Sequence, residues 1–345
     1  MGSVYFVTSD YWPHDTTLWV KDFHGNEPKF VYYFFLSIAS RIATMDVGSA
    51  NPTLNRNHVH PIKIRWPPVP TQRAIARILG ALDDKIELNR RQNATLEELA
   101  RAIFKSWFVD FDPVRARAEG RAPAAIDAAT AALFPDSFEE IGGRKVPRGW
   151  RVISLDGIAS FLNGLALQKF PPEGENYLPV IKIAQMRKDG VEGADKASPD
   201  ISSAYVVQDG DVLFSWSGSL EVMIWCGGPG ALNQHLFKVT SSQFPRWFYY
   251  LWTRHHLPNF QAIAASKVTT MGHIQRHHLT EARVIVPSDG VLAAADKLVR
   301  PIVDKFVQNK LQFRTLTALR DALLPRLLSG ELRVREAEQL VEEEV

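Results

Sequence analysis

Two copies of one helical segment decide the fold: IARILGALDDKIELNRRQNATLEELARAIF at residues 75–104 and ADKLVRPIVDKFVQNKLQFRTLTALRDALL at residues 295–324. A shift of 220 residues, without a gap, places Asn51–Phe108 on Met271–Leu328 and matches Asn89 with Asn309. So long a register is not expected by chance, and a repeat has to be recognised before a fold is assigned. The chain of 345 residues is therefore built from two related parts.

The two copies differ in length. With a small change of register the match extends upstream, so that Leu18-Trp19 falls on Leu236-Phe237 and residues 29–33 fall on residues 246–250. The segment Val146–Gly218 has no counterpart before Met1, so we expect the first copy to have lost its front half. Residues 111–147 are rich in Ala, Pro, Arg and acidic residues and are predicted to form a linker with at most one short helix.

Each copy contains a predicted long amphipathic helix, the first with a predicted N-cap at Thr71. Apolar residues recur in steps of four and three, which is a heptad pattern. They are Ile75, Leu79, Leu82, Ile86, Leu96, Ala100, Ile103 and Trp107 in the first copy, and Val299, Ile302, Phe306, Phe313, Leu316, Leu323 and Leu327 in the second. About 38 residues give the first helix a length of about 57 Å, too long for one compact domain to cover. We therefore expect the two helices to pair antiparallel and to set the spacing of the domains.

Amide side chains interrupt both heptad patterns near their middle, at Asn89, Asn93 and Asn309. Buried amides in such a seam fix the register of the helices at some cost in stability. The alternative is that the helices splay apart and the amides are solvated. Pro301 stands where the first copy has Ala81, so the second helix is predicted to begin or bend there.

The composition restricts the class of protein. Lys+Arg 40 against Asp+Glu 38 gives a formal charge of +2, so any DNA-binding face must be local. The single Cys226 excludes an internal disulfide and a four-cysteine zinc site, and it fits a reducing interior such as the cytoplasm. The most apolar stretch, residues 30–43, is too short for a membrane span, and we identify no signal peptide.

Several ordered motifs resemble one known family, the specificity subunits of type I restriction-modification systems. The helical segments 67–76, 82–91, 104–113 and 323–331 are similar to the family's helical regions. Val146-Pro147-Arg148-Gly149-Trp150 resembles the opening of one of its target-recognition domains, and residues 210–214 and 232–237 resemble the interior of that domain. Together these motifs cover most of the chain.

The resemblance implies an α+β fold with mixed-sheet target-recognition domains and two long antiparallel helices that form a coiled-coil-like spacer. It also implies recognition of double-stranded DNA as two half-sites, without catalysis by this chain. Two methyltransferase (M) subunits and the motor-nuclease (R) subunit are the implied partners, and they would hold the S-adenosylmethionine, ATP and Mg sites. The incomplete first domain puts the reading of one half-site in doubt.

The resulting domain prediction divides the chain into six segments. They are 1–68, a truncated first recognition domain; 69–110, the first long helix; 111–145, a linker; 146–288, a complete second recognition domain; 289–330, the second long helix; and 331–345, an acidic C-terminal tail.

Three polar clusters in the complete domain are candidates for DNA contacts, because forked side chains read base edges while cations and hydroxyls position phosphates. We expect Arg187 and Gln185 to read bases and Lys267 to position a phosphate. The candidates are Lys182, Gln185, Arg187 and Lys188; Ser215, Trp216, Ser217 and neighbouring Ser219; and Lys267, Thr269, Thr270, His273 and Arg276, with Arg56 as the counterpart of Arg276 in the first copy. Asn233, Gln234 and His235 either extend this set or buttress its loops.

Other functions have weaker support in the sequence. No Gly-rich phosphate loop and no methyltransferase base-flipping loop is found in the sequence. Asp15 with Glu27-Pro28-Lys29 imitates a magnesium-dependent nuclease site, but Pro28 would interrupt the strand that such a site needs. An interaction protein that binds methyltransferase partners without complete site recognition is the other alternative.

The histidines, the cysteine and the tyrosines are not predicted to form a metal site, a nucleophile or a base-stacking surface. His273 and His277 would share a face if both were helical, with His278, His255 and His256 nearby in sequence, but we expect no carboxylate or thiolate beside them to complete a metal site. Cys226 is predicted to be a small buried side chain. Tyr32-Tyr33 and Tyr249-Tyr250 could stack on bases, but their amphipathic pattern favours the core.

Overall fold

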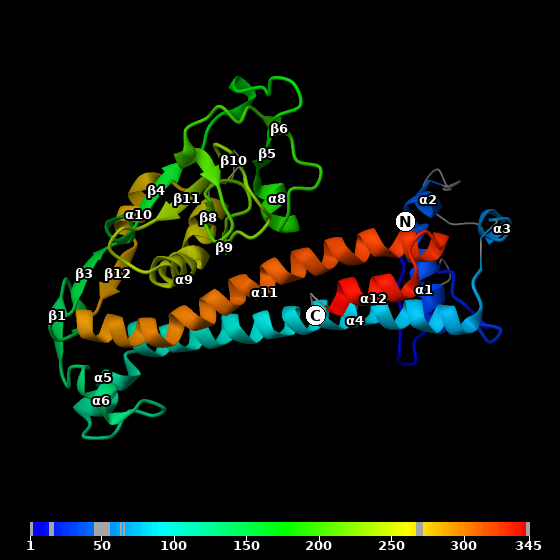
Figure 1. Cartoon of the computed structure of the whole chain (residues 1–345). Coiled ribbons are helices and arrows are strands. Elements are labelled where there is room, and N and C mark those ends of the chain that lie inside the picture. The colour runs from blue at the N-terminus through cyan, green and yellow to red at the C-terminus, as the bar shows by residue number, and fades with distance from the viewer. Residues whose placement is uncertain are drawn as a thin grey trace. The chain divides into compact units, whose positions relative to one another are not determined.

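The computed structural model describes residues 3–13, 17–44, 56–62, 64, 66–266 and 272–342, and only the backbone of Arg56. The chain divides into two compact units (Figure 1). The end unit comprises Met1–Arg91 and Gln312–Val345, and the middle unit comprises Gln92–Leu311. The two long helices continue from one unit into the other, and each unit is described below by itself.

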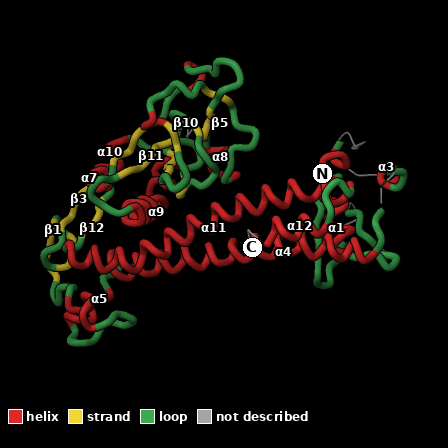
Figure 2. The backbone as a smooth tube through the Cα atoms, viewed as in Figure 1, coloured by secondary structure: helices red, strands yellow, loops and turns green. Residues whose placement is uncertain are grey.

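The helices of the described chain are drawn in red in Figure 2. They are α1 (Pro28–Ser37), α2 (Ala39–Ala43), α3 (Arg56–Val59), α4 (Val69–Phe104), the π-helical turn η1 (Lys105–Val109), α5 (Asp112–Ala118), α6 (Ala128–Ala132), α7 (Leu155–Ile158), the 3-10 turns η2 (Leu167–Lys169) and η3 (Ser203–Tyr205), α8 (Ile183–Lys188), α9 (Arg246–Ala265), α10 (Arg276–Glu281), α11 (Asp289–Ser329) and α12 (Val334–Glu342). None of them is both long and apolar enough to cross a bilayer.

The strands of the described residues are short and lie in the middle unit. They are β1 (Phe138–Ile141), β2 (Arg144–Pro147), β3 (Arg151–Ser154), β4 (Ser160–Asn163), β5 (Leu178–Ile181), β6 (Lys196–Ala197), β7 (Val206–Val207), β8 (Val212–Ser215), β9 (Glu221–Ile224), β10 (Gly230–Leu232), β11 (Leu236–Thr240) and β12 (Arg283–Val286).

In the end unit, α4 and α11 run antiparallel. Asn89 Nδ2 donates to Gln312 Oε1 at 2.9 Å, and Arg320 Nη1 donates to Asp83 Oδ1, also at 2.9 Å. An earlier residue of α4 thus contacts a later residue of α11, as expected for antiparallel helices. The apolar stripe of α4 packs with Leu316, Leu323 and Leu327 of α11 in one core.

Two further helices complete that core. In α1, Phe30 and Tyr33 are buried, and the Tyr33 hydroxyl donates to Asp83 Oδ2 at 2.7 Å. The C-terminal helix α12 is amphipathic and buries Ala337 and Val341, while its Glu338 pairs with Arg77 of α4. The segment predicted to be an acidic tail therefore includes a packed helix.

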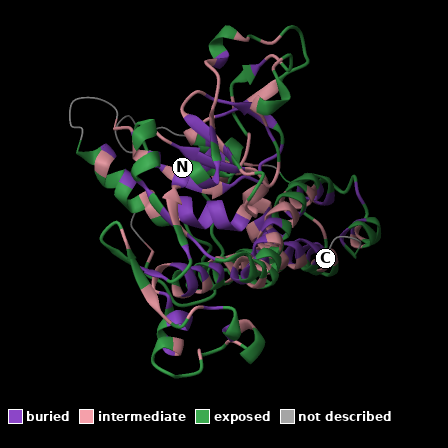
Figure 3. Ribbon diagram, turned by 90° about the vertical axis from the view of Figure 1, so that its left-hand side faces the viewer, coloured by how far each residue is buried: buried purple, intermediate pink, exposed green. Residues whose placement is uncertain are grey.

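The middle unit is built on an antiparallel sheet of order β4-β11-β8-β9. Helix α9 packs on β9 and β11 and is buried over most of its first half, as the purple helix segment in Figure 3 illustrates. A second, mixed sheet has the order β6-β5-β10-β7, with β5 and β10 parallel. Two smaller pairs, β1-β2 and β12-β3, are both antiparallel.

The parts of α4 and α11 that belong to the middle unit also run antiparallel. Asn309 Nδ2 donates to Gln92 Oε1 at 3.2 Å, and Asn93 Nδ2 donates to the Phe306 carbonyl at 3.2 Å. Asn89 and Asn309 are buried. The prediction that these amides are buried in the helix seam is confirmed, and the splayed alternative is excluded for these two residues.

The mixed α and β fold with two long helices is confirmed, while several local predictions are wrong. Helices α4 and α11 begin at Val69 and Asp289, where the domain prediction began them, so the N-cap at Thr71 and a helix start at Pro301 are wrong. Phe313 is 40% exposed, so it is not a seam residue. Within residues 111–147 the structure has α5, α6 and a β1-β2 hairpin, because Val114, Phe134 and Val146 enter the core. That stretch is therefore no simple linker.

Candidate nucleic-acid interface

Three polar segments that are far apart in the sequence meet in the middle unit. The turn after β8 bonds to the segment before α10, where Gly218 N donates to the Gly272 carbonyl at 2.8 Å and Ile274 N donates to the Trp216 carbonyl at 3.0 Å. The α8 segment joins the same turn through a hydrogen bond from the Arg187 guanidinium to the Ser219 hydroxyl. The three predicted clusters therefore form one site, as far as their residues are described.

Helix α8 presents cations on one side and is anchored on the other. Lys182 is its N-cap residue, and the Lys182 backbone N donates to Gln185 Oε1 at 3.3 Å. Gln185 is 5% exposed, so its amide supports the first turn and does not face DNA. The prediction that Gln185 reads a base is therefore wrong for this conformation. Arg187 and Lys188 are exposed, whereas Lys182 pairs with Asp195.

The turn after β8 is held by its own hydroxyls. Ser215 Oγ donates to the Ser219 carbonyl at 2.6 Å and accepts from Glu221 N at 2.8 Å. Ser217 Oγ lies 2.9 Å from His235 Nδ1. Both serines are buried, so they shape the turn and cannot contact DNA as predicted.

Trp216 is also part of the scaffold. Its Nε1 donates to Asn163 Oδ1 at 2.9 Å, and its ring lies 6.0 Å from the ring of Phe237, measured between centroids. The half-buried indole leaves only part of its surface free. Its contact with DNA stays a prediction.

The third segment contributes a second exposed arginine. Arg276 opens α10, and its guanidinium lies 5.5 Å from the Phe237 ring centroid, within the range of a cation–π interaction. His273 is half-buried beside Trp216, with ring centroids 6.3 Å apart.

Four candidates cannot be placed in this site from the described residues. Lys267, Thr269 and Thr270 lie outside the described residues. Arg56 begins α3 of the end unit, and its side chain also lies outside them.

The Asn233-Gln234-His235 turn buttresses the site. Asn233 Oδ1 accepts from His235 N at 3.2 Å, Asn233 Nδ2 donates to Gln234 Oε1 at 2.9 Å, and Asn233 itself is buried. Of the two roles considered for this turn, the contacts support the structural one.

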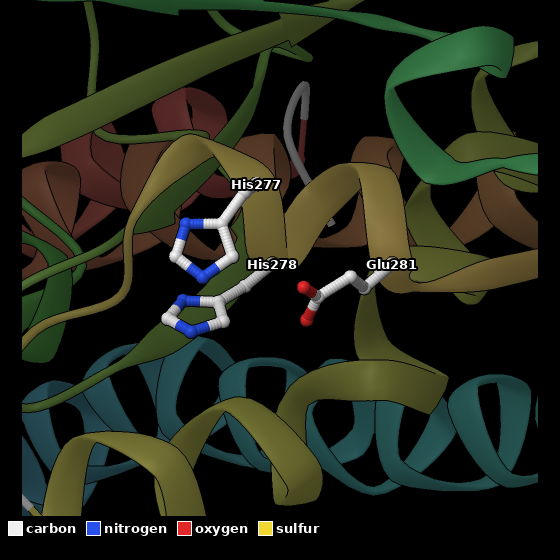
Figure 4. Close-up of side chains that lie close together, drawn as sticks. All are labelled: His277, His278 and Glu281. Atoms are coloured by element: carbon white, nitrogen blue, oxygen red, sulfur yellow. The ribbon is translucent and has the colours of Figure 1, made fainter.

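A group of possible metal ligands lies on α10, where one ligand atom each from His277, His278 and Glu281 lies within 4.8 Å of the others (Figure 4). The expectation that no carboxylate lies beside the histidines is therefore wrong, although His273 precedes the helix and does not share its face. His278 Nδ1 accepts from Gln275 N at 2.9 Å. A neutral ring that accepts at Nδ1 carries its proton on Nε2, so His278 keeps no lone pair for a metal while this bond lasts.

The burial of Cys226 and of the tyrosine pairs tests two further predictions. Cys226 is buried, and burial raises the pKa of its thiol to about 11, as expected for a core side chain. Tyr33, Tyr249 and Tyr250 are core residues, and Tyr32 is half-buried. The core interpretation of the tyrosine pairs is confirmed for these three.

The nuclease-like triplet does not form a strand. Glu27 is the N-cap residue of α1, with Pro28 at the start of the helix, and the Glu27 backbone N donates to Gln72 Oε1 at 3.0 Å. Asp15 lies outside the described residues.

Sequence reasoning missed the residue that joins the long helix to α8. Lys310 of α11 contacts Asp189, the residue that ends α8, with Nζ 2.9 Å from Oδ1 and 2.8 Å from Oδ2. No local pattern marks this pair, because the two residues are 121 positions apart and Lys310 stands within a helix full of charges.

The fold and the site together define a mixed-sheet recognition module with a long antiparallel helix pair. A family model described as "Type I restriction modification DNA specificity domain" matches residues 1–98 and 147–312. The chain belongs to this family, the specificity subunits of type I restriction-modification systems.

Individual relatives agree with this assignment. The "Type I restriction enzyme MjaIX specificity subunit" of Methanocaldococcus jannaschii is 27% identical over 327 residues, which cover 90% of this chain and 71% of that protein. The "Type I restriction enzyme HindI specificity subunit" of Haemophilus influenzae is 27% identical over 347 residues, which cover 87% of this chain and 74% of that protein. A crystal structure of the S subunit of a type I system from M. genitalium matches the fold with a TM-score of 0.52 at 17% identity, covering 88% of this chain and 72% of that one.

Proposed function

We propose that this chain reads a DNA sequence through the face formed by α8, the turn at residues 215–219 and the start of α10. The observation that carries the proposal is the convergence of these three segments with Arg187, Lys188 and Arg276 exposed. Arginine forks recognise guanine edges in the major groove, and a lysine beside them neutralises phosphate. Buried serines and amides keep the loops rigid, which favours a defined contact geometry.

The chain would direct catalytic partners to that sequence. M subunits would methylate and an R subunit would translocate and cut, and these partners would hold the S-adenosylmethionine, ATP and Mg sites. In this role the chain is a non-catalytic cytoplasmic subunit that contributes to recognition of a bipartite site. The naming of both curated relatives as specificity subunits supports this assignment.

A binding selection tests the proposal. The full chain, alone and with an M subunit, is incubated with a random duplex library, and the bound sequences are read. We expect one enriched half-site that is lost in a variant carrying Arg187→Ala, Lys188→Ala and Arg276→Ala. The control is Arg90→Ala, which removes an exposed cation paired only locally with Glu87, 3.2 Å away, and should keep the enrichment. Equal enrichment in the triple variant would refute this face.

A second function is favoured by an exposed apolar surface in the end unit, which holds the first copy of the repeat. Leu18 and Trp19 are 51% and 53% exposed, whereas their repeat counterparts Leu236 and Phe237 are buried in β11. A cavity of about 340 Å³ lies nearby, lined by Val20, Phe34 and Phe35 among others. A chain that binds M subunits but reads only one half-site fits this arrangement. Co-purification with an M subunit, together with a single half-site in the selection, would distinguish it from a bipartite reader.

A further inference from the structure

Lys310 is an unusually enclosed cation of the middle unit. Its side chain is only 15% exposed although it belongs to a long surface helix. Besides the Asp189 carboxylate, its Nζ donates to the Ile224 carbonyl at 3.2 Å and lies 5.6 Å from the Phe306 ring centroid. A cation enclosed in this way fixes the position of its anionic partner, because separating the two would leave a charge poorly solvated.

The partner of Lys310 controls one end of α8. Asp189 ends that helix with φ 52° and ψ 40°, a left-handed conformation that is uncommon for residues other than glycine. Arg187 and Lys188 directly precede it, so a displacement of Asp189 moves the exposed cations of α8. On its other side α8 is held by the buried Met186. The Lys182–Asp195 pair holds the start of the helix, and Arg187 bonds to Ser219. The Lys310–Asp189 pair is the contact that holds its C-terminal end.

The repeat supplies a natural comparison. The counterpart of Lys310 in the first copy, 220 positions earlier, is Arg90, which is exposed and pairs with Glu87 of its own helix. The first copy has no described counterpart of α8 for Arg90 to hold. The long contact made by Lys310 is therefore a property of the copy that carries α8.

We propose that Lys310 is a positioning residue for DNA recognition: through Asp189 it holds α8 in the orientation in which Arg187 meets its base. The inference rests on the proposed function of the α8 face. It links a residue of the long helix to base selectivity, although Lys310 itself does not reach the DNA-facing side chains.

The test measures base preference rather than affinity alone. In the random-duplex selection, Arg187→Ala first identifies the base position that Arg187 reads. Lys310→Met keeps the length of the side chain and removes its charge, and it should reduce discrimination at that same position about tenfold, the size of one lost bidentate contact. Asp189→Asn should act in the same way, and Lys310→Arg should retain the preference. Adding Arg187→Ala to Lys310→Met should cause little further change there.

A matched control separates positioning from general destabilisation. Lys238→Met removes another enclosed ion pair of the middle unit, between Lys238 Nζ and Asp211 Oδ2 at 2.9 Å, neither of which bonds to α8. It should lower the thermal midpoint and leave base preference unchanged. The inference is overturned if Lys310→Met keeps the wild-type preference, or if Lys238→Met alters the same position equally. If the wild-type chain selects no sequence, the proposed function fails, and the inference fails with it.

Discussion

Arg187 and Gln185 lie two positions apart on α8 and meet different surroundings. The arginine is exposed and bonds to a neighbouring turn, while the glutamine is buried and supports the backbone. The sequence shows both as polar residues with forked groups, so residue type alone assigns them the same role. Burial separates the side chain that can meet DNA from the one that holds the helix.

This contrast gives a prediction for two alanine variants. Arg187→Ala should change the selected sequence at one position by about 1–3 kcal/mol and leave the unfolding midpoint nearly unchanged. Gln185→Ala should instead lower the free energy of unfolding by about 1 kcal/mol through loss of the bond that supports the helix start. Library selection and urea denaturation of both variants check the pair. A base-specific effect of Gln185→Ala with unchanged stability would contradict the assignment.

A histidine at the edge of the core should make stability depend on pH. Burial, together with the neighbouring His255, lowers the pKa of His256 to about 4. In the unfolded chain the same histidine has a pKa near 6.5. The folded chain therefore binds fewer protons between these values, so the stability contribution is complete above about pH 6.5 and is lost as the pH falls toward 4.

The variant His256→Gln tests this dependence. Glutamine can still donate to the Arg283 carbonyl, which His256 Nε2 meets at 3.0 Å, but it does not titrate. Urea unfolding at pH 7.5 and pH 5 should show a smaller loss of stability for His256→Gln than for the wild type. The same loss in both proteins would show that other groups control the acid response.

At the level of elements, the two long helices are joined by a pair of equivalent bonds. Asn89 donates to Gln312, and Asn309 donates to Gln92. Asn309 is the repeat counterpart of Asn89, and Gln312 is the counterpart of Gln92, each at a shift of 220 residues. The two bonds are therefore equivalent under the repeat. A polar layer of this kind opposes slippage of the antiparallel pairing, since a shifted register would bury amides without partners.

Double-mutant cycles should detect both bonds. Asn89→Ala alone is expected to cost about 1 kcal/mol because it removes the hydrogen bond between the buried Asn89 and the half-buried Gln312. Adding Gln312→Ala should recover part of this loss, with a coupling of about 0.5–1.5 kcal/mol. The cycle on Asn309 and Gln92 serves as the internal replicate. Additive effects in both cycles would mean that the amides do not fix the register.

Some elements could be predicted from sequence and others could not, for physical reasons. The helices follow from a local heptad period, which correctly placed Leu79 and Leu82 in the core. The strand order β4-β11-β8-β9 depends on pairings between distant short segments, which no local period encodes. The three polar clusters proposed to bind DNA were found by their residue types, but the roles of Ser215 and Ser217 depend on the neighbours that they meet in the fold.

For the whole molecule, net charge sets the expectation for DNA affinity. The formal charge is only +2. Among its described residues, the candidate face exposes the cations Arg187, Lys188 and Arg276. Binding by the isolated chain should therefore be weak, with a shallow dependence of log affinity on log salt. Titrations at several salt concentrations measure this slope. A slope that corresponds to about ten neutralised phosphates would show a much larger basic surface than the proposed one.

The spacing role of the helices stays a prediction. Four residues inserted after Asn89 would add about 6 Å and about one helical turn. In a fusion built to carry two full-length recognition domains, this should lengthen the gap between half-sites by nearly two base pairs and keep both half-site sequences. Methylation mapping with the partner subunits measures the gap. An unchanged gap would show that the helices do not set it.

The division of the chain also dictates an order of folding during synthesis. The middle unit is one continuous stretch, Gln92–Leu311, whereas the end unit combines Met1–Arg91 with Gln312–Val345. Domains fold as units as they leave the ribosome. The middle unit can therefore fold before Leu316 and Leu323 are synthesised. Ile75, Leu79 and Leu82, which share a core with those two residues, are then not yet packed against them. Until those last residues emerge, only α1 covers the apolar face of this part of α4, so this is the interval in which a chaperone or a partner subunit would protect the nascent chain most.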